Sequence, residues 1–286
     1  MRIFNKLHLK GAFLVNLLLF GCSIFSFAQG AKGSLFIIGG GDRSAELINT
    51  LIATAKLGAK DYIVVLPMSS AEPEASFKAI AVQLARATQS PIGNLNFDAS
   101  KVADKKWLDS LRGAKLIFIT GGDQNRFMKV VRNTPVYDAI HSAYKNGATV
   151  AGTSAGAAVM SKFMITGKQL QDTVYKETFD RLHDGNIEFE TGMGLVTSVI
   201  IDQHFLKRSR YNRLISALAA HPTFDCIGID EGTALIIQGK NARIAGVSQV
   251  VRLTDPKNLR VTGTHLLKMD GMQFRLYTDG DQFLLK

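Results

Sequence analysis

Cysteine is scarce in this chain, and several familiar cofactor motifs are missing from it. Only two cysteines occur in 286 residues, Cys22 and Cys226, so a framework of internal disulfides is excluded. No P-loop is present, and the glycine run 39–41 is followed by Ser44 where a dinucleotide-binding loop needs its third glycine. No second histidine stands close to His204, so we predict no metal site and no cofactor.

Charge of one sign is not concentrated anywhere. The 34 Lys and Arg residues exceed the 24 Asp and Glu residues, but they are spread along the chain without aromatic residues between them. This pattern argues against a nucleic-acid surface. No internal repeat, linker or low-complexity tract interrupts residues 29–286, so we predict a single large α/β domain over that range.

The first 28 residues differ from the rest and predict an export signal. They contain three basic residues, no Asp or Glu, an almost wholly apolar stretch over 11–27, and a small-x-small pattern at 26–28. We therefore expect a signal peptide over 1–28 and a mature protein that is periplasmic or extracellular. Because Leu19–Cys22 resembles a bacterial lipobox, a lipoprotein anchored through Cys22 is the alternative. The bulky Phe20 in that stretch argues against it.

Apolar runs typical of buried strands alternate with segments of helical spacing along the rest of the chain. The alternation predicts an α/β fold of three layers, in which a mostly parallel sheet has helices on both faces. Antiparallel edge strands are expected near the C-terminus, a weaker strand near 95–97, and a polar excursion over 166–194. The runs on which this rests are strand-like at 35–38, 62–66, 116–120 and 196–201, and helical at 44–57, 74–88, 103–112, 135–146 and 208–220.

The stretch 149–160 contains the motif on which the functional prediction depends. It begins as an apolar strand and continues with helix-forming residues, and Gly152-x-Ser154-x-Gly156 lies at the junction. Glycines on both sides of a serine let the backbone turn sharply from strand to helix, which holds the hydroxyl above the C-terminal edge of a sheet. A helix N-terminus there favours an oxyanion. We interpret Ser154 as a nucleophile; the alternative is a tight turn with an N-cap serine.

A serine nucleophile needs a base, and the base needs a carboxylate to orient it. His204 is the candidate base because it follows the apolar strand 196–201 at its C-terminal end, which we expect at the same sheet edge as Ser154; His183 stays open as a rival. Glu231 is the candidate acid, since it ends another apolar run beside a glycine; Asp172, in the polar excursion, is the alternative acid. A hydrogen-bonded structural histidine and an exposed turn acid are the alternatives without catalysis.

An oxyanion would need two backbone N–H groups close to the serine. We expect one from Ala155 and a second from the Gly121-Gly122 pair, for which we take Gly122, because glycine lets the backbone approach a ligand closely. Gln124 would then point a neutral amide into the pocket. The alternative for this stretch is an ordinary turn in which Asp123 caps a helix.

Four segments together resemble the cyanophycinase family of serine peptidases, which also contains the aspartyl dipeptidase peptidase E. They are 121–124, 152–157, 202–213 and 228–234, in order between residues 33 and 245. The resemblance implies a class I glutamine amidotransferase-like fold and a Ser-His-Glu triad of Ser154, His204 and Glu231. It also implies a substrate pocket containing Gln124, Asp202, Gln203, Arg208, Arg210 and Arg213.

The resemblance, with the export signal, implies an exported serine exopeptidase that hydrolyses β-Asp-Arg or related Asp-containing peptides through an acyl-enzyme. The expected partner is a peptide substrate, cyanophycin or an Asp-containing dipeptide, with a homodimer as an option and no nucleic acid. Because arginine pairs well with carboxylates, we expect one or two of the three clustered arginines to face the site. A non-catalytic substrate-binding homologue and an esterase or amidohydrolase that uses the same serine stay open.

Overall fold

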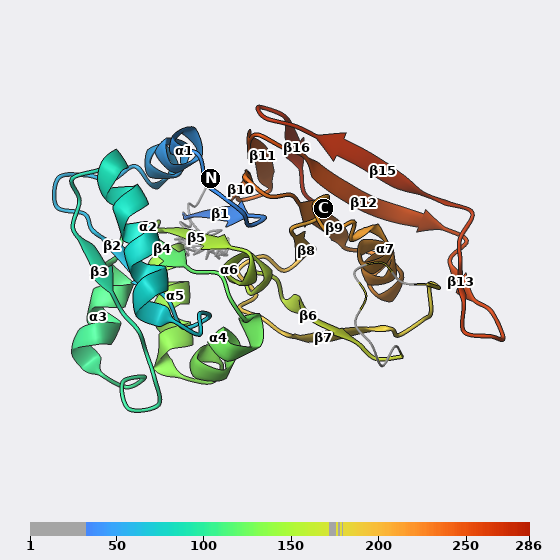
Figure 1. Cartoon of the computed structure of the whole chain (residues 1–286), viewed down its shortest axis with the longest axis horizontal. Helices are drawn as coiled ribbons and strands as arrows, with labels where there is room; N and C mark the ends of the chain where they lie inside the picture. The colour runs from blue at the N-terminus through green and yellow to red at the C-terminus, as the bar shows by residue number, and fades with distance from the viewer. Residues whose placement is uncertain (1–32, 172–175, 177, 179) are drawn as a thin grey trace, which may run out of the picture.

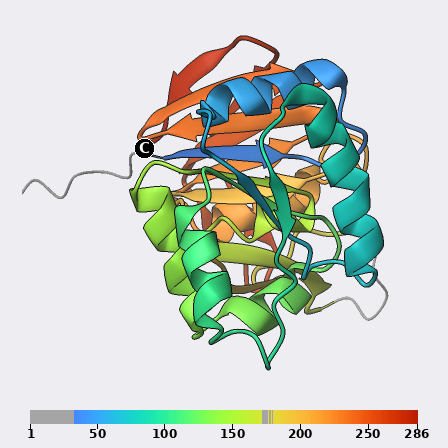
Figure 2. The same ribbon diagram turned by 90° about the vertical axis from the view of Figure 1, so that its left-hand side faces the viewer.

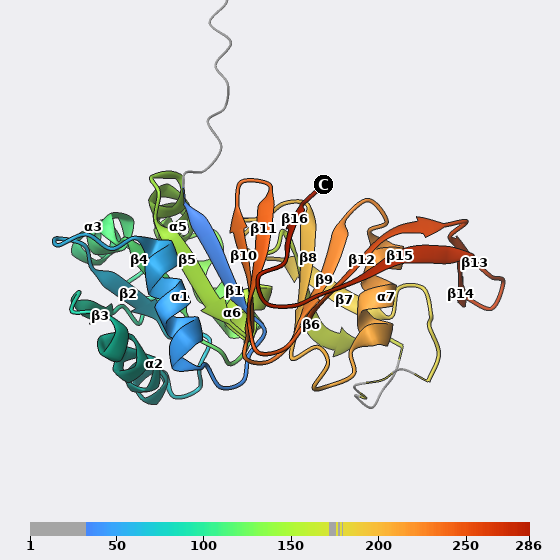
Figure 3. The ribbon, with the colours of Figure 1, turned by 90° about the horizontal axis from the view of Figure 1, so that it is seen from above.

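Two β-sheets lie side by side in the computed structural model, which describes residues 33–171, 176, 178 and 180–286 (Figure 1 and Figure 3). The larger sheet has eight strands in the order β16-β11-β10-β1-β5-β4-β2-β3, and the smaller has four in the order β15-β12-β9-β8. Within the described residues, two short pairs, β6 with β7 and β13 with β14, complete the strands. The protein is thus an α/β fold with a large, mostly parallel central sheet.

The parallel part of the larger sheet comes from the apolar runs in the first half of the chain. Most of its side chains are buried on both faces, and such strands are continuously apolar in sequence. The weak strand predicted near 95–97 lies instead at 92–94, where half-exposed residues at the sheet edge break the apolar pattern. These parallel strands are β1 (Ser34–Ile38), β5 (Thr149–Thr153), β4 (Leu116–Ile119), β2 (Ile63–Leu66) and β3 (Ile92–Asn94).

Antiparallel strands from the end of the chain extend the other side of this sheet. They are β10 (Thr233–Gln238), β11 (Asn241–Gly246) and β16 (Gln282–Leu284), and β10 pairs directly with β1. The prediction of antiparallel strands near the C-terminus is therefore confirmed.

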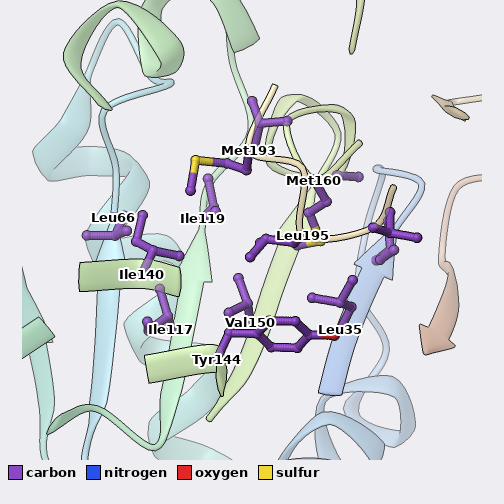
Figure 4. Close-up of a cluster of buried hydrophobic side chains, with 14 of the residues drawn as sticks. Leu35, Leu66, Ile117, Ile119, Ile140, Tyr144, Val150, Met160, Met193 and Leu195 are labelled. Carbon is purple, nitrogen blue, oxygen red and sulfur yellow. The ribbon is translucent and has the colours of Figure 1, made fainter. Parts of the chain in front are cut away.

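Helices cover both faces of the larger sheet, as the blue and teal helices on one side and the green ones on the other show in Figure 2. Side chains along β1 point alternately to the two faces of the sheet. Phe36 therefore contacts helices on one face, the first layer, and Leu35 contacts helices on the other face, the second layer. In the second layer, Tyr144 lies beside Val150, and Ile140 lies beside Leu66 and Ile117 (Figure 4). The first layer holds α1 (Ala45–Ala55) and α2 (Pro73–Ala87), and the second holds α3 (Lys105–Gly113), α4 (Gln124–Val131) and α5 (Pro135–Lys145).

Helix α4 is missing from the sequence-based prediction. It follows Asp123, whose carboxylate accepts hydrogen bonds from the N–H groups of Asn125 and Arg126 at 2.7 and 3.4 Å. This is the N-cap role given above as the alternative for that turn. A cap followed by buried Phe127 and Val131 is a helix signal, but eight residues are too few for a clear periodic pattern.

The strand that precedes His204 belongs to the smaller sheet, so the expectation of one common sheet edge for Ser154 and His204 is wrong. Both sheets contain fully apolar strands, and composition alone does not say which strand pairs with which. Helix α7 packs on one face of the smaller sheet. The other face of that sheet shares a hydrophobic core with the larger sheet and its second helix layer. The elements are β8 (Val199–Gln203), β9 (Asp225–Ile229), β12 (Val250–Lys257), β15 (Gly271–Tyr277) and α7 (Tyr211–Ala220).

The predicted polar excursion contains a second, smaller correction. Strands β6 (Phe163–Gln169) and β7 (Ile187–Thr191) pair antiparallel within it, with an irregular register after Ile165. Four of their twelve residues are buried and Gly167 interrupts β6, so no continuous apolar run marks them. A further short pair, β13 (Arg260–Val261) with β14 (Leu267–Lys268), is exposed. Among the described residues, no helix has the length and apolar character needed to cross a membrane.

Candidate active site

Ser154 lies on a sharp turn between β5 and the four-residue helix α6 (Ala155–Ala158). Its backbone dihedrals are φ 53° and ψ −111°, which only a well-supported turn imposes on a residue with a side chain. A Cβ atom on Gly152 would lie 2.2 Å from the Gly156 carbonyl oxygen, and one on Gly156 would lie 2.3 Å from the Ile119 carbonyl oxygen. Both glycines are therefore required by close backbone packing. The serine side chain makes no capping hydrogen bond, so the N-cap alternative is wrong.

Ser154, His204 and Glu231 form one hydrogen-bonded line. His204 Nε2 is 2.9 Å from Ser154 Oγ, and His204 Nδ1 is 2.6 Å from Glu231 Oε1. An ionised carboxylate can only accept, so Nδ1 carries the ring proton and Nε2 is left to accept from the serine hydroxyl. This is the arrangement that raises the nucleophilicity of a serine.

The glycine run 39–41 is where the two sheets meet behind this line. The backbone N–H of His204 donates to the Gly39 carbonyl at 2.7 Å, and a Cβ atom on Gly40 would lie 2.3 Å from the His204 ring. A Cβ atom on Gly41 would lie 2.7 Å from Cβ of Glu231. The sequence alone gives 39–41 no role in the site, because the run does not match a dinucleotide-binding loop. The signal was three successive glycines directly after a buried strand.

Burial lowers the pKa of His204 below its ordinary value. Desolvation of the charged ring is the largest cause, since 13% of the side chain is exposed. The hydrogen bond and charge of Glu231 raise the pKa, while the positive charges of Arg208 and Arg210 lower it further. The ring is therefore neutral at neutral pH, the form in which it can take a proton from Ser154.

A cavity of about 300 Å³ opens beside Ser154 and His204. Its volume is at the small end of ligand sites, which measure roughly 300–1,000 Å³, so it suits a short peptide or a single residue. Among the described residues that line it, none is Asp or Glu. Besides the serine and the histidine, the lining consists of Gly40, Gly41, Arg43, Ser76, Ala79, Ile80, Phe118, Thr120, Gly121 and Thr153.

Backbone N–H groups flank Ser154 on two sides. Ala155 is the first residue of α6, where the N–H has no intrahelical acceptor. On the other side, a Cβ atom on Gly121 would lie 3.5 Å from that of Ser154, and Gly122 packs against the Ser69 backbone. With only four residues, α6 has little macrodipole, so any oxyanion stabilisation must come from single N–H groups.

Four of the residues assigned to a substrate pocket pair with each other instead of lining the cavity. Arg213 Nε donates to Asp202 Oδ2 at 2.7 Å, and its Nη2 donates to Oδ1. Arg210 Nη1 donates to the backbone and side-chain oxygens of Gln203 at 2.6 and 2.9 Å. All four side chains are buried. They support the loop that carries His204.

The remaining two pocket candidates also lie outside the cavity lining. The Gln124 amide nitrogen donates to the Ile165 and Thr166 carbonyls at 3.1 and 2.7 Å, which ties α4 to β6. Arg208 is exposed and precedes α7, so the prediction of a helix beginning at Arg208 is wrong. The chain turns at Ser209, with φ 50°, before the helix begins.

Three other residues named above have separate outcomes. Asp172 lies outside the described residues. His183 pairs through a backbone bridge with Leu266, while the hydrogen-bond partner of Ser154 is His204. Cys226 is fully buried and burial raises the pKa of its thiol far above the ordinary value, so it is an inert core residue.

The fold and the site define a serine-type peptidase, and comparisons give its family. The chain belongs to peptidase family S51, whose model matches residues 35–245. It is similar to the cyanophycinase of Trichormus variabilis, with 32% identity over 274 residues that cover 90% of this chain and 87% of that protein. It is also similar to the cyanophycinase of Thermosynechococcus vestitus, with 30% identity over 276 residues, 90% of this chain and 81% of that one.

More distant similarities agree with this membership. Peptidase E of Pasteurella multocida is 28% identical over 159 residues, which cover 54% of this chain and 64% of that one. A solved peptidase from an acI-B1 actinobacterium has a TM-score of 0.64 at 21% identity and covers 90% of this chain and 98% of its own. The latter similarity concerns the fold alone.

Proposed function

We propose that this protein is an exported serine exopeptidase that hydrolyses β-linked Asp–Arg units or related Asp-containing peptides through an acyl-enzyme. The observation that carries the proposal is the line from Glu231 through His204 to Ser154, with contacts of 2.6 and 2.9 Å. The names of the similar cyanophycinases and of peptidase E support the choice of substrate class.

The proposed reaction has two halves. Ser154 Oγ attacks the scissile carbonyl and its proton passes to His204 Nε2, while Glu231 stabilises the imidazolium. The N–H groups of Ala155 and Gly122 bind the oxyanion. The departing amine takes the proton from Nε2, which leaves an ester on Ser154. A water molecule then gives a proton to His204 Nε2 as its oxygen attacks the ester; the acyl–Oγ bond breaks, the carboxylic acid leaves, and Ser154 Oγ takes the proton back from Nε2.

Substitution of Ser154 by alanine tests the reaction. We expect turnover to fall by a factor on the order of a million, without a change in the thermal unfolding midpoint, because the turn is held by its flanking glycines and the hydroxyl bonds to the catalytic His204. The measurement is release of product from β-Asp-Arg, an α-Asp dipeptide and a nitrophenyl ester. Near wild-type rates in Ser154→Ala would exclude the serine mechanism. Cleavage of the ester alone would identify an esterase, and binding without turnover a substrate-binding homologue.

Export is a separate part of the proposal and has its own test. Residues 1–28, which carry the expected signal peptide, lie outside the described residues. We expect the mature protein to begin at about Gln29 when it is isolated from a bacterial host that processes such signals. Mass spectrometry of the mature N-terminus measures this. A diacylglycerol group on Cys22 would instead establish the lipoprotein alternative.

A further inference from the structure

Arg43 lines the same cavity as Ser154 and His204. It follows the glycine run 39–41 and precedes helix α1. Among the described residues that line the cavity, it is the only one with a permanent positive charge, and none carries a carboxylate. Arg43 is therefore the charged group of the cavity lining that an anionic part of a ligand would meet.

Neutral oxygens hold the Arg43 side chain in place. Its Nε donates to Gln83 Oε1 of α2 at 2.9 Å, and its Nη1 donates to the Gly41 carbonyl at 3.3 Å. No carboxylate oxygen lies within 4.0 Å of it among the described residues, although Asp42 is its neighbour in the chain. Two fixed hydrogen bonds orient the planar guanidinium without neutralising it, and at least Nη2 remains for a ligand.

Burial makes this charge a stronger partner than a surface arginine. Arg43 is half-buried, and this desolvation lowers the pKa of its guanidinium from the ordinary value. An arginine stays protonated even so. A partly desolvated cation gains more from a bound carboxylate than an exposed one does, because the surrounding solvent screens the pair less.

The other buried arginines of the site already have anionic or polar protein partners. Arg213 is bound by the carboxylate of Asp202, and Arg210 by both oxygens of Gln203. Arg208, by contrast, is exposed and outside the cavity. Recognition of a substrate carboxylate in the cavity thus falls to Arg43.

We infer that Arg43, oriented by Gln83, determines specificity by binding a carboxylate of the peptide whose scissile carbonyl lies at Ser154. The inference rests on the proposed function. The carboxylate has two sources in a short peptide, an acidic side chain or the free C-terminus, and both offer the same bidentate partner to a guanidinium.

Matched substrate pairs on the intact protein test this inference. One pair has Asp or Asn on the acyl side, and the other has a free or an amidated C-terminus. In the wild-type protein, kcat/KM should favour the charged member of at least one pair. Arg43→Gln should reduce that preference by roughly 10- to 100-fold, as expected for a charge-assisted hydrogen bond. The pair that responds identifies the source of the carboxylate.

Arg86→Gln is the control, because Arg86 is exposed on α2 and lines, together with Arg43 and Gln83, a neighbouring hollow that neither Ser154 nor His204 lines. It should leave both preferences unchanged. If Arg43→Gln does not fold, as judged by its unfolding midpoint, Arg43→Met carries the same expectation. A fall in kcat/KM that is equal for both members of each pair would overturn the inference, even though the peptidase reaction stands.

A binding measurement separates this inference from the proposed reaction. Calorimetric titration of the Ser154→Ala variant with N-acetyl-aspartate and N-acetyl-asparagine needs no turnover. We expect tighter binding of the aspartate, and loss of that difference when Arg43→Gln is added. If the wild type cleaves no peptide yet this difference exists and depends on Arg43, the proposed function fails and the carboxylate site stands. If no difference depends on Arg43 in either assay, the inference is wrong.

Discussion

The two sheets contribute to the site in different ways. The larger one provides Ser154 on a turn that is fixed by its own flanking glycines, whereas the smaller one provides His204 at the end of β8. Glu231 lies in the connection from β9 of the smaller sheet to β10 of the larger. The position of the serine is therefore a local property of the chain. The alignment of the histidine with it is a property of the junction between two sheets.

Removing the charge of Glu231 should have the largest effect on that junction. In Glu231→Gln the shape is kept, but the ring of His204 loses the acceptor that fixes its tautomer and stabilises the imidazolium. We expect turnover to fall roughly ten-thousand-fold, as in other triads that lose their acid, with little change in KM. Steady-state kinetics on the best peptide measures this. Asp172→Asn should cost much less, and the opposite ranking would make Asp172 the acid.

A methyl group placed between the two sheets should have an intermediate effect. In Gly40→Ala the new Cβ would lie 2.3–2.8 Å from three atoms of the His204 ring, so the ring must shift away from Ser154. A displacement of about 1 Å at a catalytic group costs on the order of 100-fold in rate, and kcat/KM measures it.

The matched control for this substitution is Gly280→Ala. Gly280 also has a positive φ, 84°, but nothing lies within 4 Å of an added Cβ atom. It shares the backbone strain without the crowding, so its kcat/KM should match the wild type. Equal losses in both variants would show that strain, and not the position of His204, is responsible.

A change in charge near His204 should have the smallest effect. The positive charge of Arg208 contributes to lowering the pKa of His204, and only the neutral ring can act as base. In the wild type, activity should therefore persist below pH ~6.5, the ordinary histidine value, until the ring is protonated. Arg208→Gln raises the pKa, so the acidic limb of the kcat/KM profile should move to higher pH.

Two further measurements of the pH profile test whether the charge of Arg208 causes the shift. Because Arg208 is exposed, the shift should diminish at high salt, where its charge is screened. Lys207→Gln removes an exposed charge next to it that does not contribute to lowering this pKa, and its profile should coincide with the wild type. A downward shift in Arg208→Gln would contradict the assigned sign.

The same contrast explains what could be predicted from sequence. Strands β1, β2, β4 and β5 and the turn at Ser154 leave local signals, namely continuous apolar runs and glycines at fixed spacing. His204 and Glu231 could be proposed from their positions after apolar strands. That those strands lie in two sheets depends on pairing between distant segments, which composition does not encode.

Side-chain direction was harder to predict than position. Arg213 looks like a substrate ligand in sequence, but Asp202 binds it in the interior because two buried opposite charges need each other. The role of Arg43 could not be predicted from the sequence, because a single arginine after a glycine run is not a motif. Its importance depends on the space in front of Ser154, which exists only in the folded protein.

The pairing of β1 with β10 has a consequence for the time at which activity arises. Leu35 lies opposite Ile237 in that pair, so the first strand meets this partner only after most of the polypeptide has been synthesised, whereas its other partner, β5, is made earlier. Contacts so distant along the chain slow folding. Glu231 directly precedes β10, and the carboxylate reaches His204 through the same late step. A nascent or partly folded chain is thus expected to be proteolytically inert, so that it is not a hazard to the cell that makes it.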